Sequence, residues 1–426
     1  MILLYQLLGS LGLLLLAPVL AMVVLARPQY RQRFLARLGW GLAGLLSRAA
    51  AGRPRIWIHA LSVGEVTSVA PLVRGFRELR PEVAIVFSTT TASGAAAAGR
   101  LLAGVADAII PFPFDLGPVV RRYFRLVQPG LVVVVETDLW PRFLHEILRR
   151  RLPAVLVNGR LSEAGWRRYR RLRPLLAPLL AAFRVVAVQS GQDGQRFRDL
   201  GAPADRVVAL GNLKYEAGSP AAPGGAALRR ADLGLATGVF LLVAGSTHAG
   251  EEGPLLDALR DLTPRFPGLR LAIAPRRIER GPEVAALATG QGWRCGRRQG
   301  PCPDDPQVFV LDTLGELVAL YALADAAFIG GSLVAVRGHN PLEAARLGKP
   351  VLFGPHMEDF AEIAADLEAA GAAFRVADSR ELARRLAQLL ADAGLRQAMA
   401  GAGLRLVAAH AGVTRRHLEL LSGLWP

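Results

Sequence analysis

Short apolar segments alternate with helix-like segments along most of this chain, and this alternation constrains the fold more than any other feature. The clearest apolar segment is 131–135, in which four valines follow a leucine without interruption. A strand buried on both faces of a parallel sheet has this composition, whereas a strand with one wet face alternates polar and apolar residues. Strands that alternate with helices form parallel sheets covered on both faces. The chain is therefore predicted to be an α/β protein with doubly wound, Rossmann-like sheets.

The alternation occurs in two series along the chain. The first contains predicted strands at 56–60, 83–88, 108–111, 131–135, 154–158 and 184–189, and the second at 239–244, 270–274, 308–311 and 351–353. Between them, residues 217–227 read AGSPAAPGGAA, a composition typical of a linker. A chain of 426 residues is long enough for two cores. We predict one α/β domain at 55–216, a linker at 217–230 and a second α/β domain at 231–426.

Residues 1–26 contain no charged side chain. A helix of this length spans the hydrocarbon core of a membrane, which is about 30 Å thick. Basic residues come after the stretch instead of before it, at Arg27, Arg31, Arg33 and Arg37. A cleaved signal peptide has its basic residues before the apolar run, and the positive-inside rule places the chain after such a helix in the cytoplasm. We therefore predict a transmembrane anchor at 1–26 and a basic, amphipathic membrane-proximal segment at 27–54.

The charge balance indicates an anionic partner. The sequence has 51 Lys plus Arg against 35 Asp plus Glu, a formal net charge of +16. Neither a paired-cysteine zinc pattern nor an aromatic RNA-binding signature is present, so a membrane surface or a phosphorylated lipid fits better than nucleic acid. The two cysteines form no disulfide framework, which favours a reducing compartment. The sequence contains no HExxH, DxD or Walker motif, so we expect no dedicated metal.

A polar turn follows the first predicted strand, with Ser62, Gly64 and Glu65 opening the next helix. A carboxylate at this edge of a parallel sheet is suited to accept a proton as a general base. Ser62 and Glu65 are also spaced as a capping box. The spacing alone leaves both roles open.

A second acidic turn, ETDLWP at 136–141, follows the all-valine strand. Glu136 and Asp138 suit the hydroxyls of a sugar, although a plain strand-end turn with Trp140 in the core explains the same pattern. The next strand leads to Arg160 and then to an arginine-rich stretch at 167–173. This stretch is suited to lipid phosphates or forms an ordinary solvated face.

Polar residues also follow the strands of the second series. Ser246, Thr247 and His248 follow one strand, and Gly330, Gly331 and Ser332 follow another. Glycines let backbone N–H groups approach a ligand closely. Asn340 and Pro341 have the spacing of a helix start, which attracts anions. This pattern favours a phosphate or nucleotide site, while reciprocal capping between Asn340 and Glu343 is the alternative reading.

These blocks, in this order, resemble the 3-deoxy-D-manno-octulosonic acid (Kdo) transferases. The resemblance runs from the N-terminal segment to His356, and its most specific parts are SVGE, ETDLWP, NGRLS, GSTHAGEE, DTLGE and GGSLVAVRGHNPLE. It implies a two-domain glycosyltransferase of the GT-B type that moves Kdo from CMP-Kdo to the lipid A precursor at the cytoplasmic face of the bacterial inner membrane. The first domain would bind the acceptor and the second the nucleotide, with CMP-Kdo as substrate and no separate cofactor.

The resemblance also implies roles for individual residues. Glu65 matches the catalytic base, and Ser62, Gly64, Glu136, Asp138 and Arg160 become candidate acceptor contacts. The positions that match the CMP-binding residues are Pro275, Arg276, Leu314, Gly315, Glu316, Asn340, Pro341, Leu342 and Glu343. Candidate donor or phosphate contacts are Ser246, Thr247, His248, Gly330, Gly331 and Ser332. Arg277, Arg337 and Asp138 depart from the family pattern, in which His, Gly and Glu are usual.

Two other functions remain open at this point. One is a membrane-associated GT-B transferase that uses a UDP-sugar. The other is a basic protein that binds anionic lipid without catalysis.

Overall fold

The computed structural model describes residues 34–49, 52–217 and 228–425. They form two compact units. Unit 1 holds the described residues up to 217 and residues 412–425, and unit 2 holds residues 228–411. The predicted membrane anchor at 1–26 and residues 218–227 of the predicted linker at 217–230 lie outside the described residues. Within the described part of the chain, no helix has the length and hydrophobicity needed to cross a membrane.

Unit 1 is built on a seven-stranded sheet with the order β3-β2-β1-β4-β5-β6-β7, and all neighbouring strands are parallel. Its strands are β1 (Arg55–His59), β2 (Ala84–Thr89), β3 (Ala108–Pro111), β4 (Leu131–Val135), β5 (Ala154–Gly159), β6 (Val185–Val188) and β7 (Val207–Ala209). All six predicted strands of the first series are present. The sequence analysis missed β7 because this edge strand has only three residues, two of them exposed.

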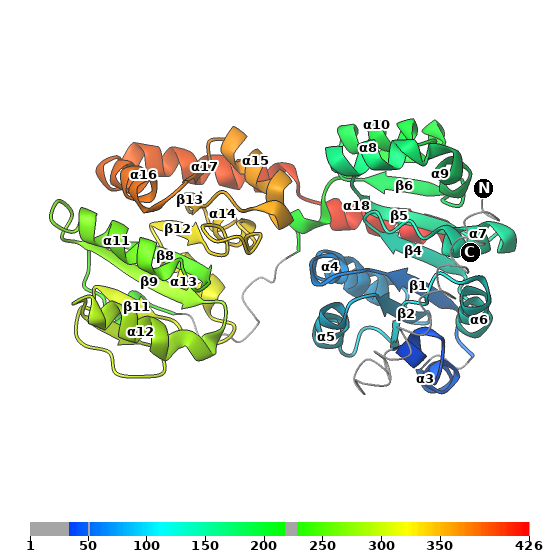
Figure 1. The fold of residues 1–426 in the computed structure, drawn as a ribbon, viewed down its shortest axis with the longest axis horizontal. Helices are drawn as coiled ribbons and strands as arrows, with labels where there is room; N and C mark the ends of the chain where they lie inside the picture. The colour runs from blue at the N-terminus through cyan, green and yellow to red at the C-terminus, as the bar shows by residue number, and fades with distance from the viewer. Residues whose placement is uncertain (1–33, 50–51, 218–227, 426) are drawn as a thin grey trace, which may run out of the picture. The chain divides into compact units, whose positions relative to one another are not determined.

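Helices cover both faces of this sheet (Figure 1). They are α3 (Leu42–Ala49), α4 (Val63–Leu79), α5 (Ala92–Leu101), α6 (Gly117–Val127), α7 (Pro141–Arg150), α8 (Glu163–Arg171), α9 (Arg173–Leu180), α10 (Gly191–Asp199) and α18 (Val413–Leu424), with short 3-10 turns η1 (Ala204–Arg206) and η2 (Leu213–Tyr215). Neighbouring residues of one strand enter different cores. Trp57 packs with α6, α7 and α9, whereas Ile56 and Ile58 pack with α4, α5 and α18. This explains the unbroken apolar run of β4, because every position of that strand is buried.

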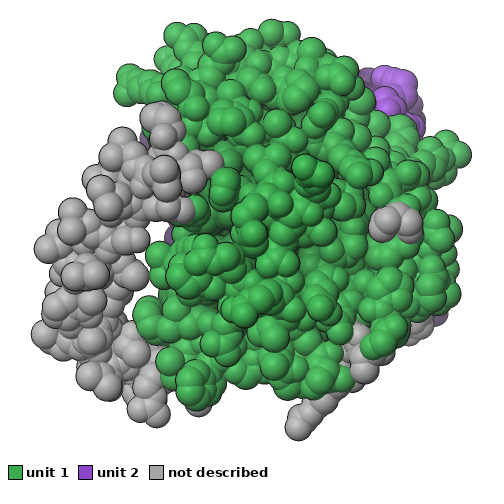
Figure 2. Space-filling view, turned by 90° about the vertical axis from the view of Figure 1, so that its right-hand side faces the viewer, with its two compact units in different colours: residues 1–218, 412–426 green, residues 219–411 purple. Residues whose placement is uncertain are grey.

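The C-terminal helix α18 belongs to unit 1 (green in Figure 2). The predicted second domain ran to residue 426, whereas the chain returns to unit 1 from Gly412 onwards. Glu216 holds the return point, since its carboxylate accepts a hydrogen bond of 2.6 Å from Thr414 N. Leu421 is buried in the core shared with α4. Tertiary packing that joins distant segments in this way leaves no local sequence pattern.

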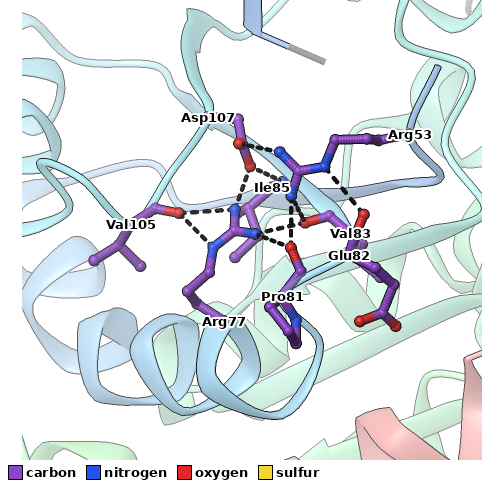
Figure 3. A network of polar contacts seen from close by, with 8 residues as sticks. All are labelled: Arg53, Arg77, Pro81, Glu82, Val83, Ile85, Val105 and Asp107. Carbon is purple, nitrogen blue, oxygen red and sulfur yellow. Dashed lines mark hydrogen bonds and ion pairs between the residues drawn. The ribbon is translucent and has the colours of Figure 1, made fainter. Parts of the chain in front are cut away.

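An ionic network ties the amino ends of three strands in unit 1 (Figure 3). Asp107, before β3, accepts from Arg53 Nη1 at 2.6 Å and from Ile85 N at 2.7 Å. Arg77, in the last turn of α4, also donates to Asp107 and to the Val83 carbonyl. The side chains are partly buried, so these bonds are less screened than a surface pair. The network fixes the edge of the sheet opposite to the strand carboxyl ends.

Unit 2 repeats the architecture with the strand order β10-β11-β9-β8-β12-β13-β14, again with parallel neighbours. The strands are β8 (Phe240–Thr247), β9 (Leu269–Pro275), β10 (Cys295–Arg297), β11 (Val308–Val310), β12 (Ala326–Ile329), β13 (Val351–Phe353) and β14 (Ala373–Arg375). The helices are α11 (Glu252–Leu262), α12 (Gly281–Gly290), α13 (Leu317–Leu323), α14 (Leu342–Ala345), α15 (Ala361–Ala369), α16 (Ser379–Ala391) and α17 (Ala393–Ala409), with turns η3 (Arg230–Leu233), η4 (Ile278–Arg280) and η5 (Glu358–Phe360).

In each sheet, the first strands of the series are added toward one edge and the later strands toward the other edge. The order changes direction between two neighbouring inner strands. In unit 1 this happens between β1 and β4, and in unit 2 between β8 and β12. Loops that follow such a pair leave in opposite directions, so ligands of doubly wound proteins bind at this point, beyond the strand carboxyl ends. The turns after these four strands carry Glu65, Glu136, His248 and Gly331, all of which the sequence analysis singled out.

Candidate active site

Glu65 lies in the first turn of α4, directly after the β1 turn. Ser62 is the N-cap residue, and its hydroxyl accepts from Glu65 N at 3.5 Å and donates to Glu65 Oε1 at 3.2 Å. The other carboxylate oxygen accepts from Leu61 N at 2.6 Å. The side chain therefore satisfies helix-end groups, as the capping reading predicted. Gly64 lies in the first turn of α4, where an added Cβ would lie 4.0 Å from the Ser62 hydroxyl.

The surroundings of Glu65 also raise its pKa into the range that suits a general base. Burial, followed by the negative charges of Glu136 and Asp138, raises its pKa from 4.5 to about 8, against the opposing effect of the hydrogen bonds from Leu61 and Ser62. A carboxylate that titrates near neutral pH takes up a proton far more readily than an ordinary one. The two roles left open by the sequence are thus compatible.

The acidic turn after β4 places its carboxylates near Glu65. Glu136 has a positive φ of 58°, and its Oε1 lies 3.6 Å from Lys214 Nζ. Asp138 Oδ2 lies 2.6 Å from His59 Nε2. The Thr137 hydroxyl donates to the carbonyl of Arg160, which brings that residue to the same turn. Trp140 packs against the core, in agreement with the plain reading of this motif.

His59 is a site residue that the sequence analysis missed. It is fully buried at the end of β1, its Nδ1 lies 3.0 Å from both Ser88 Oγ and Ser88 O, and its ring stacks on Phe112 with centroids 3.7 Å apart. It therefore fixes the Asp138 carboxylate from inside the protein. A histidine that ends an otherwise apolar strand was the available signal.

In unit 2, two histidines face each other at the reversal of the sheet. His248 and His339 have parallel rings with centroids 5.1 Å apart, and their Nε2 atoms are separated by 2.9 Å. Burial, then the charge of Arg276, then His248 lower the pKa of His339 to about 4. Burial is also the main cause of the lowered pKa of His248. Both rings are neutral at pH 7, so one Nε2 carries a proton that the other accepts.

Arg276 lies within electrostatic reach of both histidines and of Glu343. The pKa of Glu343 is raised by burial, while Arg346 and Arg276 act in the opposite direction. Arg276 is exposed and follows Pro275, the last residue of β9; its backbone N–H donates to Thr247 O at 2.9 Å. Arg276, His248 and His339 thus form one cluster at the strand ends, and Glu343 is linked to it through Arg276. His339 is the member that the sequence analysis missed.

The glycine turn after β12 is shaped by its neighbours. A Cβ at Gly330 would lie 2.4 Å from Ser246 O, so only glycine fits there. The amides of Gly331 and Ser332, two of the candidate donor or phosphate contacts, donate to Glu251. The Ser332 hydroxyl accepts from Gly354 N at 2.8 Å, and Thr247 Oγ1 donates to Glu252 at 3.0 Å.

The helix predicted to start at Asn340 and Pro341 has a single turn in the structure. It comprises Leu342–Ala345, with Pro341 at the N-cap and no side-chain capping bond. Reciprocal capping would require Asn340 Oδ1 to accept from Glu343 N. Instead, Asn340 Oδ1 accepts from Leu342 N at 3.1 Å. Arg337 has a positive φ of 75°, a conformation that favours glycine, and it pairs with Asp359 at 2.7 Å.

The loop after β11 holds the remaining predicted donor residues. Leu314 is 77% exposed, and Gly315 has a φ of 87°. Glu316 pairs with Arg298 at 2.8 Å. An exposed leucine that precedes a glycine and an ordered acid is suited to contact a flat, partly apolar ligand group. Among the described residues, no group of three or more His, Cys, Asp or Glu side chains is arranged to hold a metal ion.

Comparison with known proteins identifies the family. Residues 32–217 match the family described as 3-Deoxy-D-manno-octulosonic-acid transferase (kdotransferase), and residues 305–405 match Glycosyl transferases group 1. The 3-deoxy-D-manno-octulosonic acid transferase of Haemophilus influenzae is 35% identical over 79% of this chain and 78% of its own. That of Bordetella pertussis is 33% identical over 90% of both chains.

A solved structure supports the fold. The glycotransferase of kitacinnamycin superposes with a TM-score of 0.57 at 15% identity, over 88% of this chain and 100% of its own. Two parallel-sheet α/β units of this kind are the GT-B glycosyltransferase fold, as predicted. Taken with the two relatives, these matches show that the chain is a glycosyltransferase and belongs to the 3-deoxy-D-manno-octulosonic acid transferase family.

Proposed function

We propose that this protein transfers Kdo from CMP-Kdo to the lipid A precursor, an inverting glycosyl transfer in lipopolysaccharide synthesis. The relatives that share most of its length carry the name of that activity. The observation within the chain that carries the proposal is Glu65, a carboxyl at the reversal of the sheet whose pKa is raised to about 8. A group of this acidity is suited to activate a sugar hydroxyl near neutral pH.

The proposed reaction forms one bond and breaks one bond. A hydroxyl oxygen of the acceptor attacks the anomeric C2 of Kdo, and the C2–O bond to CMP breaks on the opposite face of the ring, so configuration inverts. Glu65 takes the hydroxyl proton as the new bond forms. CMP leaves with the electron pair as a phosphate monoester anion. The step uses only acid–base and electrostatic chemistry.

Unit 2 supplies the donor half in this proposal. Arg276 carries the positive charge that the leaving phosphate needs, and it lies in the cluster with His248 and His339, within electrostatic reach of Glu343. Preorganised positive charge and N–H donors stabilise a departing phosphate without reorganisation. Leu314, Gly315 and Glu316, at the end of β11, are the proposed contacts for the nucleoside, together with Asn340, Pro341 and Leu342.

The acceptor is an anionic lipid in this proposal, which agrees with the net charge of +16. Unit 1 carries Arg160 beside the acidic turn and the arginine-rich helix α8. On α3 and just before it, Trp40 is 72% exposed and Leu45 is 51% exposed. Exposed aromatic and aliphatic side chains of this kind insert into a membrane interface. We therefore propose a bacterial inner-membrane location, with residues 1–26 as the anchor and the catalytic units on the cytoplasmic side.

Donor choice and product mass test this proposal. The purified protein is incubated with lipid A precursor and either CMP-Kdo or a UDP-sugar, and the lipid product is analysed by mass spectrometry. The expected result is addition of Kdo from CMP-Kdo alone. Transfer from the UDP-sugar instead, or binding of the lipid without any transfer from CMP-Kdo, would contradict the proposed function.

A further inference from the structure

A single buried carboxylate in unit 2 accepts four backbone hydrogen bonds. Glu251 is completely buried, and its Oε2 accepts from His248 N at 2.9 Å and from Gly331 N at 2.6 Å. Its Oε1 accepts from Ser332 N and Leu333 N, both at 2.9 Å. Three consecutive amides from the turn after β12 thus converge on a side chain that precedes α11.

This geometry is that of an anion-binding nest. Consecutive N–H groups around a residue with positive φ form a concave site for an anion, and Gly331 has a φ of 68°. Here the anion is part of the chain itself. Charge-assisted bonds from amides stabilise a buried carboxylate, so Glu251 fills the place that the sequence pattern assigned to a ligand phosphate.

The same carboxylate holds the backbone on both sides of the histidine pair. It binds the amide of His248 directly. On the other side, Gly331 O accepts from Gly338 N at 2.8 Å, and His339 follows in the chain. A Cβ at Gly331 would lie 3.1 Å from the His339 ring and 3.5 Å from the His248 ring, so this backbone packs against both rings.

We infer that Glu251 is a positioning residue of the donor site: it occupies the amide cradle as a built-in anion and thereby fixes the His248–His339 pair that meets the anionic donor. This inference rests on the proposed function for the identity of the donor. The 2.9 Å contact between the two Nε2 atoms requires both rings to be placed accurately. Loss of the carboxylate leaves four amides without their acceptor, and the turn carrying Gly331 no longer has a fixed place.

Chemical rescue tests this role. In the full chain, Glu251→Ala removes the carboxylate and leaves space where acetate or formate can bind. The KM for CMP-Kdo is expected to rise about 10- to 100-fold, as for a misplaced binding group. Added acetate is expected to return the KM most of the way to the wild-type value, whereas chloride at equal ionic strength is expected to have no such effect. Glu251→Gln is not expected to recover, because its amide presents an N–H group to the backbone donors.

Matched variants separate positioning from general stability. Glu252→Ala removes the next buried carboxylate, which binds Thr247 and Arg280 instead of the turn, so acetate is expected to leave its KM unchanged. Asp257→Ala changes an exposed residue of the same helix and is expected to behave as wild type. If Glu251→Ala does not fold, Glu251→Asp carries the test, with a raised KM and a folded protein as the expected result.

Three results would overturn the inference. They are a wild-type KM in Glu251→Ala or Glu251→Asp, a raised KM that acetate leaves unchanged, and equal rescue of Glu252→Ala by acetate. Failure of the proposed function has a different signature, since the wild-type protein itself would then not use CMP-Kdo. Binding of CMP alone, measured by calorimetry on the same variants, reports on the site without the acceptor.

Discussion

The pH dependence of transfer follows from the surroundings of Glu65. The base must be ionised to take a proton, and its pKa is raised to about 8. At pH 7 about one-tenth of the Glu65 side chains are then charged, and at pH 8 about half. We expect kcat/KM to rise about fivefold from pH 7 to pH 8 and to level off above pH 9. The assay is initial-rate transfer at low CMP-Kdo concentration across this range.

Removing the charge of Glu136 should shift the pH profile of kcat/KM. The charge of Glu136 contributes to the raised pKa of Glu65, so Glu136→Gln is expected to shift the inflection to lower pH and to raise the ionised fraction at pH 7. A profile that is flat from pH 6 to pH 9, or an inflection that stays in place in Glu136→Gln, would refute the assignment of the inflection to Glu65. Trp140→Phe, a change in the same turn without a charge, is the control.

The free energy of unfolding should fall with rising pH because of Glu65, whereas transfer activity should rise. The folded-state pKa of about 8 lies above the ordinary 4.5, so the contribution of this carboxyl to stability is fully present below about pH 4.5 and is lost as pH rises through about 8. Glu65→Gln is therefore expected to raise the melting temperature relative to wild type more at pH 9 than at pH 5. If Glu65 acted only as a helix cap, its substitution would instead lower the free energy of unfolding by about 1 kcal/mol, with little dependence on pH.

Three further predictions concern the Asp107 network, the histidine beside the acidic turn and the loop after β11. Asp107→Asn should lower the free energy of unfolding by about 2 kcal/mol while transfer activity is retained, because the network lies at the far edge of the sheet; urea unfolding and a transfer assay measure both, and unchanged stability would contradict it. His59→Phe should release the Asp138 carboxylate and lower kcat/KM by about tenfold with a folded protein by circular dichroism; a wild-type rate would speak against the role of His59. Arg298→Ala should free Glu316 and raise the Kd for CMP severalfold in calorimetry, while Arg298→Lys has a smaller effect; equal Kd values in all three proteins would exclude it.

Local patterns predicted the central strands well. The strands Leu131–Val135 and Val351–Phe353 have the predicted bounds, because apolar runs buried on both faces are visible in the sequence itself. The three-residue edge strands β7, β10 and β14 were missed. Cys295–Arg297 shows why: an edge strand pairs on one side only and needs no apolar run.

The site was predicted as a set of turns but not as a set of contacts. Spacing predicted the bond between Ser62 and Glu65, since both partners belong to one helix start. The pairs His59–Asp138 and His248–His339 join residues far apart in the chain. Their contact depends on the order and register of the strands, which no local pattern encodes. For the same reason a glycine turn that looked like a ligand cradle accommodates Glu251 instead.

The most direct test of Glu65 as the catalytic base is transfer by Glu65→Ala. Purified wild-type protein and variant are incubated with CMP-Kdo and lipid A precursor at pH 8, and the lipid product is quantified by mass spectrometry alongside a melting curve. We predict a folded variant whose transfer is reduced by about 10²- to 10⁴-fold, the usual contribution of a general base. Near-normal transfer by the folded variant would contradict this role and leave Glu65 as a helix cap.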